Sequence, residues 1–288
     1  MTYQTSDSEI IDYGIVTLPG TQALIRGPLP KNFGEGGYIC AIGAAQTFGR
    51  FAEQPFLTRV GAALGRETLN LGLAGGGPKH FASRPGMIAA ANRASIVILQ
   101  VMSGRSVSNS VFENPGAGSL RPWGSPPERK ARHAEIEYSE LYQREGKDFI
   151  QMVLEETRAN YLAEYDLLLS RIKVPVLLFW FSTRGPEYNE VYAQGVDRPA
   201  GGFLGAFPQL VNAATFSALS GKVQNHASCI SGRGLPQPLR HKVTGEPVDL
   251  GIAPRYPGHN NYYPSPEMHE DAAAVLIPKV REMLSLAA

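Results

Sequence analysis

Short, mainly apolar runs alternate with longer segments of mixed polarity along most of the chain. The four clearest runs cover residues 38–42, 68–71, 95–101 and 175–181. Continuous apolar runs of this length are typical of strands that are covered on both faces, whereas a half-exposed strand alternates apolar and polar positions. The runs therefore predict four buried strands, and a further strand is expected at residues 226–230.

Amphipathic segments between these runs predict helices. They cover residues 51–64, 84–92, 135–172, 208–219 and 268–286, with a break in the third near Gly146. Strands that alternate with helices favour the α/β class, here a three-layer α/β/α fold with a mostly parallel central sheet.

The remaining segments are rich in Gly, Pro and polar residues. We expect an N-terminal extension at residues 1–36, with a short strand pair near 15–18 and 23–25, and a single α/β domain at 37–288. The segment at 113–130 contains too much Gly, Pro and Ser for regular structure, and it is predicted to be a loop or lid inserted into that domain.

Composition and charge then exclude several classes of protein. The 288 residues are 43% hydrophobic, which supports a large core and argues against disorder. The net charge is +1, so there is no global basic field to hold nucleic acid or an anionic membrane. No apolar run approaches the roughly 20 residues of a membrane span, and the polar N-terminus is unlike a secretion signal. We expect a cytoplasmic protein that neither inserts into membranes nor binds nucleic acid.

Cysteine and histidine usage gives no sign of a metal. The two cysteines, Cys40 and Cys229, are too few for a disulfide scaffold, and the histidine spacing fits no common metal site. We therefore predict no metal and no tightly bound cofactor.

Small, polar or cationic residues follow the predicted strands. Because parallel strands bring their carboxyl ends to one edge of the sheet, where α/β proteins bind ligands, these residues form a candidate site. Its members are Gly43, Ala45, Gln46, Gly72, Gly75, Ser103, Arg105, Asn109 and Arg184. The guanidinium of Arg105 suits a phosphate, sulfate or carboxylate, although surface arginines are commoner. The segment at 43–49 is equally consistent with an ordinary strand-to-helix turn.

A further polar cluster leads into the last predicted helix. His269 falls in the first turn, where the helix dipole lowers its pKa and favours the neutral base. Glu267 or Ser265 could orient it, although Ser-Pro-Glu is also a plain helix start. Aromatic residues that could stack on a sugar or an adenine are Trp123, Trp180, Tyr262 and Tyr263, with core packing favoured for Trp180.

The order of these blocks resembles the SGNH (GDSL-type) hydrolase superfamily, which implies a flavodoxin-like three-layer fold. In that superfamily a Gly-Asp-Ser block follows the first strand, a Gly and an Asn complete the oxyanion hole, and Asp-x-x-His supplies the base. The resemblance covers about residues 38–110 and 174–285. It sets the segment at 43–49 at the first block, Gly72 or Gly75 at the second, Asn109 at the third and His269 at the fourth.

The sequence departs from this pattern at the reacting positions. Ala44 and Ala45 stand where the superfamily has Asp and Ser. Three residues before His269, where the superfamily has Asp, this sequence has Pro266. A covalent acyl-serine mechanism therefore lacks its serine, and Thr47 or Ser103 would have to act as a displaced nucleophile. The phrases GAAQTFGRF, FPQLV and YYPSPEMH also resemble a bacterial protein family of unassigned function.

Three functions stay open. The first is a transferase that moves an acyl or sulfuryl group from an anionic donor to a hydroxyl of a small-molecule or saccharide acceptor, with His269 as general base. The donor would be a coenzyme A thioester, as relatives of the fold that bind coenzyme A imply, or 3′-phosphoadenosine-5′-phosphosulfate, as a faint resemblance of residues 95–112 to the 3′-phosphate segment of sulfotransferases implies. Capsule-biosynthesis relatives of the fold imply a place in polysaccharide biosynthesis. The second is a carbohydrate esterase, and the third is a non-catalytic binding protein. A homodimer formed through the N-terminal segment also stays open.

Overall fold

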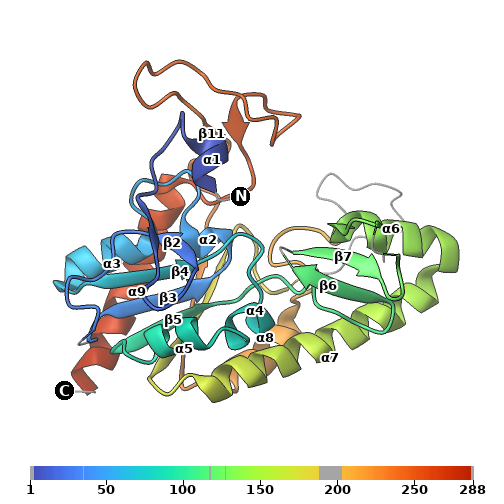
Figure 1. Cartoon of the computed structure of the whole chain (residues 1–288), viewed down its shortest axis with the longest axis horizontal. Helices are drawn as coiled ribbons and strands as arrows, with labels where there is room; N and C mark the ends of the chain where they lie inside the picture. The colour runs from blue at the N-terminus through green and yellow to red at the C-terminus, as the bar shows by residue number, and fades with distance from the viewer. Residues whose placement is uncertain (1–2, 35, 117, 127, 188–202, 287–288) are drawn as a thin grey trace.

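The centre of the molecule is a seven-stranded sheet in the order β1-β2-β4-β3-β5-β9-β10 (Figure 1). The computed structural model describes residues 3–34, 36–116, 118–126, 128–187 and 203–286. Five neighbouring strands run parallel: β4 (Thr68–Gly72), β3 (Ile39–Gly43), β5 (Ile96–Gln100), β9 (Val176–Ser182) and β10 (Asn225–Ile230). In chain order they read 2-1-3-4-5, which is the flavodoxin-like arrangement. The predicted α/β class with a mostly parallel sheet is confirmed.

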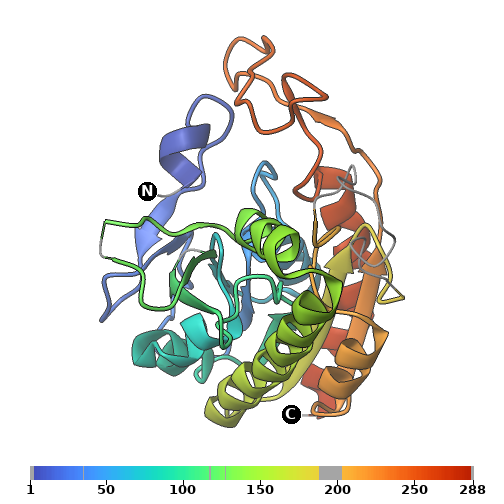
Figure 2. The same ribbon diagram turned by 90° about the vertical axis from the view of Figure 1, so that its right-hand side faces the viewer.

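Side chains on the parallel strands alternate between two hydrophobic cores, one on each face of the sheet. On β9, Leu178 and Trp180 enter one core, whereas Phe179 and Phe181 enter the other. Helices α3 (Phe56–Leu64) and α9 (Pro266–Leu286) pack on the second face. The first face is covered by α4 (Pro78–Ala82), α5 (Pro85–Ala91), α7 (Lys147–Arg171) and α8 (Ala213–Ser220) (Figures 1 and 2). The mainly apolar runs are therefore strands buried on both sides, as the sequence predicts.

The N-terminal residues extend this sheet by two antiparallel strands. The predicted strand pair is present as β1 (Ile15–Thr17) and β2 (Leu24–Arg26), and β2 joins β4 through the pairing of Arg26 with Asn70. Ahead of them, α1 (Tyr3–Asp7) lies above the edge where the parallel strands end (Figure 1). Residues of the expected N-terminal extension are therefore part of the main sheet.

The prediction that residues 113–130 lack regular structure is wrong. A three-stranded antiparallel sheet forms from β6 (Phe112–Gly116), β7 (Ser119–Pro122) and β8 (Arg132–His133). Glu113 and Arg121 face each other across β6 and β7 and form an ion pair of 2.7 Å. Phe112 and Leu120 are buried against α6 (Ala134–Glu145) and the first half of α7. The turn glycines that suggested a loop belong to a hairpin with its own small core.

The remaining helices follow the sequence closely. The break predicted near Gly146 separates α6 from α7, and Gly146 has a positive φ of 81°. The helix predicted at 51–64 begins later, at Phe56, because the chain loops through Phe51, whose φ is 64°. Short elements complete the fold: α2 (Ala45–Phe48), β11 (Gln237–Pro238) and β12 (His259–Asn260).

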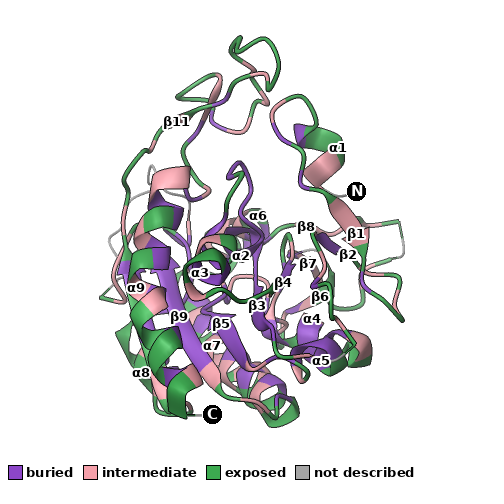
Figure 3. Ribbon diagram, turned by 90° about the vertical axis from the view of Figure 1, so that its left-hand side faces the viewer, coloured by how far each residue is buried: buried purple, intermediate pink, exposed green. Residues whose placement is uncertain are grey.

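Burial decreases from the sheet toward the loops above its carboxyl edge. Figure 3 shows buried residues along β3, β5 and β9, whereas the long loop that carries β11 is mostly exposed. Within the described part of the chain, no helix combines the length and apolar character needed to cross a bilayer.

We predict that Gly72→Ala destabilises the fold by about 1–3 kcal/mol, the usual cost of overpacking. A Cβ at Gly72 would collide with the backbone nitrogen and Cα of Phe48, so the turn after β3 would have to move. Gly232→Ala is the matched control, because a Cβ there meets no atom within 4 Å and the residue is exposed. Urea denaturation gives both free energies of unfolding, and equal values for the two variants would contradict the prediction.

Candidate functional site

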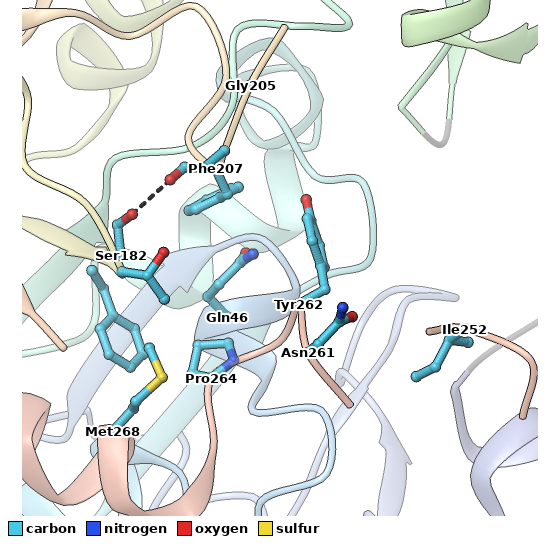
Figure 4. A pocket seen from close by; sticks show the side chains of 12 residues that line it. Gln46, Ser182, Gly205, Phe207, Ile252, Asn261, Tyr262, Pro264 and Met268 are labelled. Atoms are coloured by element: carbon cyan, nitrogen blue, oxygen red, sulfur yellow. Dashed lines mark hydrogen bonds between the residues drawn. The ribbon is translucent and has the colours of Figure 1, made fainter. Parts of the chain in front are cut away.

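A groove lies along the carboxyl ends of β3, β5 and β9, where the sequence places the candidate site. It contains two adjoining cavities, of about 360 Å³ and 60 Å³, that share walls at Gln46, Phe207 and Tyr262. The larger cavity is also bordered by Ser182, Asn261 and Met268 (Figure 4). The smaller cavity, next to the turn after β3, is lined by Tyr3, Ala44, Ala45, Gly75, Gly76, Ser103, Arg105, Ser106, Gly118 and Tyr263 as well.

The turn after β3 is held by two buried amides on neighbouring strands. Gln100 on β5 accepts hydrogen bonds from the Ala44 N–H (2.9 Å) and from the Thr47 hydroxyl (2.7 Å). Asn70 on β4 donates to the Thr47 carbonyl at 2.9 Å and accepts the Gly72 N–H at 2.8 Å. A buried polar group without a partner is costly, so these bonds fix the turn strongly.

Thr47 is therefore part of the support of the turn, and its expected role as a displaced nucleophile has no geometric basis. Its side chain is fully buried, lines none of the described cavities, and has its hydroxyl proton committed to Gln100. Gly43 serves the same support, because a Cβ there would collide with Thr47 Oγ1 and Gln100 Oε1.

Gln46 is the polar side chain at the junction of the two cavities. It follows Ala44 and Ala45, which also line the smaller cavity and have only a methyl group as side chain. Gln46 is buried, and its Oε1 has no hydrogen-bond partner among the described residues. Figure 4 shows its amide between Phe207 and Tyr262, directed into the larger cavity. Gln46 and Tyr262 are thus the polar side chains among the residues that both cavities share.

Arg105 brings a positive charge to the smaller cavity. Among the described residues that line this cavity it is the only charged one, and its guanidinium donates to the Tyr262 hydroxyl at 3.4 Å. Ser103 also lines the cavity, but its hydroxyl donates to Gln209 Oε1 at 2.8 Å and accepts the Arg105 N–H at 3.2 Å. No His, Asp or Glu contacts Ser103 through a described hydrogen bond, so it has no base to activate it.

The charge of Arg105 also reaches the start of α6. Burial lowers the pKa of His133, and the Arg105 charge lowers it further. Burial raises the pKa of Glu135, while the Leu204 N–H and Arg105 oppose that shift. The Glu135 carboxylate accepts the Leu204 N–H at 2.8 Å, which ties α6 to the segment that carries Phe207.

The structure does not give His269 the position of a general base. Its side chain is fully buried in α9, stacked near Phe56 and Phe181, and it lines none of the described cavities. Its Nδ1 accepts the Phe56 N–H at 3.1 Å, while Nε2 is buried without a partner. Burial, with smaller contributions from the Arg26 and Arg59 charges, lowers its pKa to about 3. The imidazole is thus a neutral core group.

Three further predicted site residues lie away from the two cavities. Asn109 is buried and donates to Tyr138 and Thr157, both at 2.9 Å, so it supports the hairpin and does not form an oxyanion hole beside Ala45. Arg184 donates to backbone carbonyls, including those of Pro208 and Val211. The carbonyl of Glu267 accepts from Arg233, and its carboxylate makes no described hydrogen bond to His269.

Of the two candidate glycines after β4, Gly75 lines the smaller cavity, whereas Gly72 lies under the turn. The sequence did not single out Tyr3, Phe207 or Gly118 for this site. No sequence pattern indicated that these three residues belong to the site, because they come from segments that are far in sequence from the ends of the predicted strands. Trp180 is fully buried, in line with its expected core packing. Within the described residues, no group of three or more His, Cys, Asp or Glu side chains could hold a metal ion.

Comparison with known proteins adds a family likeness and distant structural likenesses. Residues 1–114 match a family described as a domain of unknown function, DUF6473. No curated protein matches the chain. Among solved structures it is similar to the lipase Lip_vut3 from a goat rumen metagenome, at 12% identity and a TM-score of 0.45, covering 86% of this chain and 97% of that one. A protein described as a possible lipase from Chitinophaga pinensis shows 14% identity and a TM-score of 0.44, with 85% and 98% covered.

We predict that His269 makes stability depend on pH between about 6.5 and 3. Because its pKa is lower in the folded protein than the ordinary value near 6.5, the unfolded chain binds more protons in this window. Stability is complete above about pH 6.5 and decreases as the pH falls, by about 2 kcal/mol at pH 5 for this one group. Urea denaturation from pH 7.5 to 5 measures the slope.

His269→Gln is the variant for this test, because a glutamine keeps an acceptor for the Phe56 N–H but does not titrate. Its free energy of unfolding should fall less steeply with pH than that of the parent. His80, whose pKa burial and the Arg84 charge lower to about 4, keeps its own contribution in both proteins. Parallel curves for parent and variant would exclude His269 as a source of the slope.

Proposed function

We propose that the groove binds a small anionic molecule that carries hydroxyl groups, without a covalent intermediate on the protein. The observation that carries this proposal is the pairing of Arg105 with Ala45 in one small cavity. A guanidinium there gives a fork of donors for a phosphate, sulfate or carboxylate. Ala45, which lines the same cavity, has no nucleophilic side chain.

The larger cavity supports a hydroxylated, uncharged part of the same ligand or of a second one. Its walls alternate amide or hydroxyl groups with apolar and aromatic surface: Gln46, Ser182, Thr183 and Asn261 with Phe181, Phe207, Tyr262, Pro264 and Met268. Binding pockets of this mixed kind fix orientation through a few polar groups while the apolar walls supply contact. A sugar ring, with polar edges and C–H faces, matches such a lining.

Arg105→Ala is expected to remove most of the binding of an anionic ligand. The test is a thermal-shift panel of coenzyme A, acetyl-coenzyme A, adenosine 3′,5′-bisphosphate and nucleotide sugars. A ligand at about 100 times its dissociation constant adds about 2.7 kcal/mol of stability, and this gain should disappear in the variant. Arg105→Lys should recover part of it, because the charge remains but the fork is lost.

Arg144→Ala is the matched control, since Arg144 is exposed, pairs only with its neighbour Glu145 among the described ion pairs, and lines none of the described cavities. It should keep the full shift. An equal loss in both arginine variants, or no shift with any member of the panel, would overturn the proposal.

Direct group transfer is a second candidate, favoured by the two cavities that meet at Gln46. A donor anion next to Arg105 would place its acyl or sulfuryl group beside an acceptor hydroxyl in the larger cavity. The acceptor oxygen would form the new bond to the transferred group, the donor thiolate or phosphate would leave, and the acceptor proton would go to the leaving group or to solvent. Holding two reactants together lowers the barrier without a protein nucleophile.

Transfer and hydrolysis through a displaced nucleophile predict different products. With acetyl-coenzyme A and a mixture of saccharides, we expect free thiol to appear only when an acceptor is present, and the protein mass to stay unchanged. Thiol titration measures the free thiol, and intact-protein mass spectrometry measures the mass of the protein. Thiol release without any acceptor, together with an acetyl group on Ser103 or Thr47 that is lost on Ala substitution there, would instead favour the esterase.

A further inference from the structure

The groove continues beyond Arg105 into two more cavities. A third cavity, of about 230 Å³, shares walls with the second at Gly75, Ser103 and Ser106. A fourth, open cavity of about 530 Å³ shares walls with the third at Lys79, Ser108 and Glu164. We call the four adjoining cavities the trough. It runs from the loop before α9, across the carboxyl edge of the sheet, to the outer side of α7.

The third cavity has two cations and four hydroxyl groups among its lining residues. Lys79 and Arg84 come from α4 and its C-terminal flank, and Ser83, Ser103, Ser106 and Ser108 add hydroxyl groups. One carboxylate, that of Glu164, is present; burial raises its pKa, and it accepts the Lys79 N–H at 3.4 Å. His80, whose lowered pKa keeps it neutral, adds no charge near pH 7. Together with Arg105 in the second cavity, these residues give the second and third cavities three cations against one carboxylate.

The fourth cavity has an aromatic and aliphatic wall among polar groups. Trp123 on the hairpin is 55% exposed, and its indole N–H donates to the Asn109 carbonyl at 2.7 Å, which fixes the ring. Helix α7 borders the same cavity with Asn160, Ala163, Glu164 and Leu167, spaced as one helix face, with Leu167 39% exposed. Glu156 of α7 lines it as well, and its carboxylate accepts the Ser110 N–H at 2.8 Å and the Ser110 hydroxyl at 2.6 Å. A fixed, half-exposed indole beside amide and carboxylate groups matches the C–H face and hydroxyl edge of a sugar.

From this arrangement we infer that the natural ligand is an acidic oligosaccharide, a chain of several sugars that lies along the trough. Its negative charges would meet Arg105, Lys79 and Arg84, and its distal sugar would stack on Trp123. This inference rests on the proposed function and extends it from a small anion to a chain. A single small anion would use only the two central cavities and leave the Trp123 wall without an occupant.

The experiment compares oligogalacturonides and heparin-derived oligosaccharides, from monosaccharide or disaccharide to hexasaccharide, with neutral malto-oligosaccharides of matching length. Isothermal titration of the full chain gives each dissociation constant. We expect affinity to rise with length in at least one acidic series and to weaken with added salt, since the central contacts are partly exposed ion pairs. The neutral series should bind at least tenfold more weakly.

Trp123→Ala should weaken the longest acidic ligand about tenfold and leave the shortest unchanged, the size expected for one stacking contact. Lys79→Ala combined with Arg84→Ala should weaken the acidic chains and reduce their salt dependence. Tyr256→Ala is the matched control for Trp123, because Tyr256 is also an exposed aromatic residue but lines none of the four cavities.

The outcomes separate this inference from the proposed function. If small anions bind through Arg105 but affinity does not grow with chain length in either acidic series, the acidic chain is wrong and the proposed function stands. If Trp123→Ala and Tyr256→Ala behave alike, the fourth cavity is not a sugar subsite. If neither small anions nor acidic chains bind, both ideas are overturned.

Discussion

The buried ion pair between Asp7 and Arg50 holds together the segments from which the groove is built. Arg50 donates two hydrogen bonds of 2.8 Å to the Asp7 carboxylate and one of 3.0 Å to the Tyr263 hydroxyl. Its guanidinium lies over the rings of Tyr3, Phe51 and Tyr263. Removing one partner of such a buried pair leaves an uncompensated charge, at a typical cost of 3–5 kcal/mol. One cation thus joins the N-terminal helix, the turn after β3 and the loop before α9, and each of these contributes to the small cavity.

A second buried arginine completes this support from the edge of the sheet. Arg26, at the end of β2, donates to four backbone carbonyls between residues 48 and 53, at distances from 2.7 to 3.1 Å. These carbonyls belong to the last residue of α2 and to the irregular loop that follows it, and the guanidinium supplies hydrogen bonds that their burial requires. Burial lowers the pKa of Arg26 to about 10, which still leaves it charged at neutral pH. The N-terminal residues therefore shape the site, although their sequence suggests a mere extension.

The sequence predicts what depends on local pattern and misses what depends on distant partners. The buried strands and the break at Gly146 follow from apolar runs and from a glycine of positive φ, both readable within a few residues. Thr47 and His269 are different, because a polar residue near a strand or helix end suits either catalysis or the support of buried backbone. The choice is made by Gln100 and by the Phe56 N–H, each more than fifty residues away. The hairpin was missed for a similar reason, since its core is completed by α6 and α7.

Some polar residues at the sheet edge hydrogen-bond within the fold, whereas others line the groove. This difference favours the binding and positioning of ligands over covalent catalysis as the proposed role of the site. Gln100, Asn70 and Thr47 form hydrogen bonds that hold the turn after β3, and His269 accepts the backbone N–H at the start of α3. Gln46, Arg105 and Tyr262 are among the groups that line the groove, and they supply hydrogen-bond donors, acceptors and a positive charge. A rigid turn with methyl groups at its tip and a fixed cation beside it is preorganised to hold an anion. Under the proposed function, chemistry at this edge would come from the bound molecules, which the protein orients.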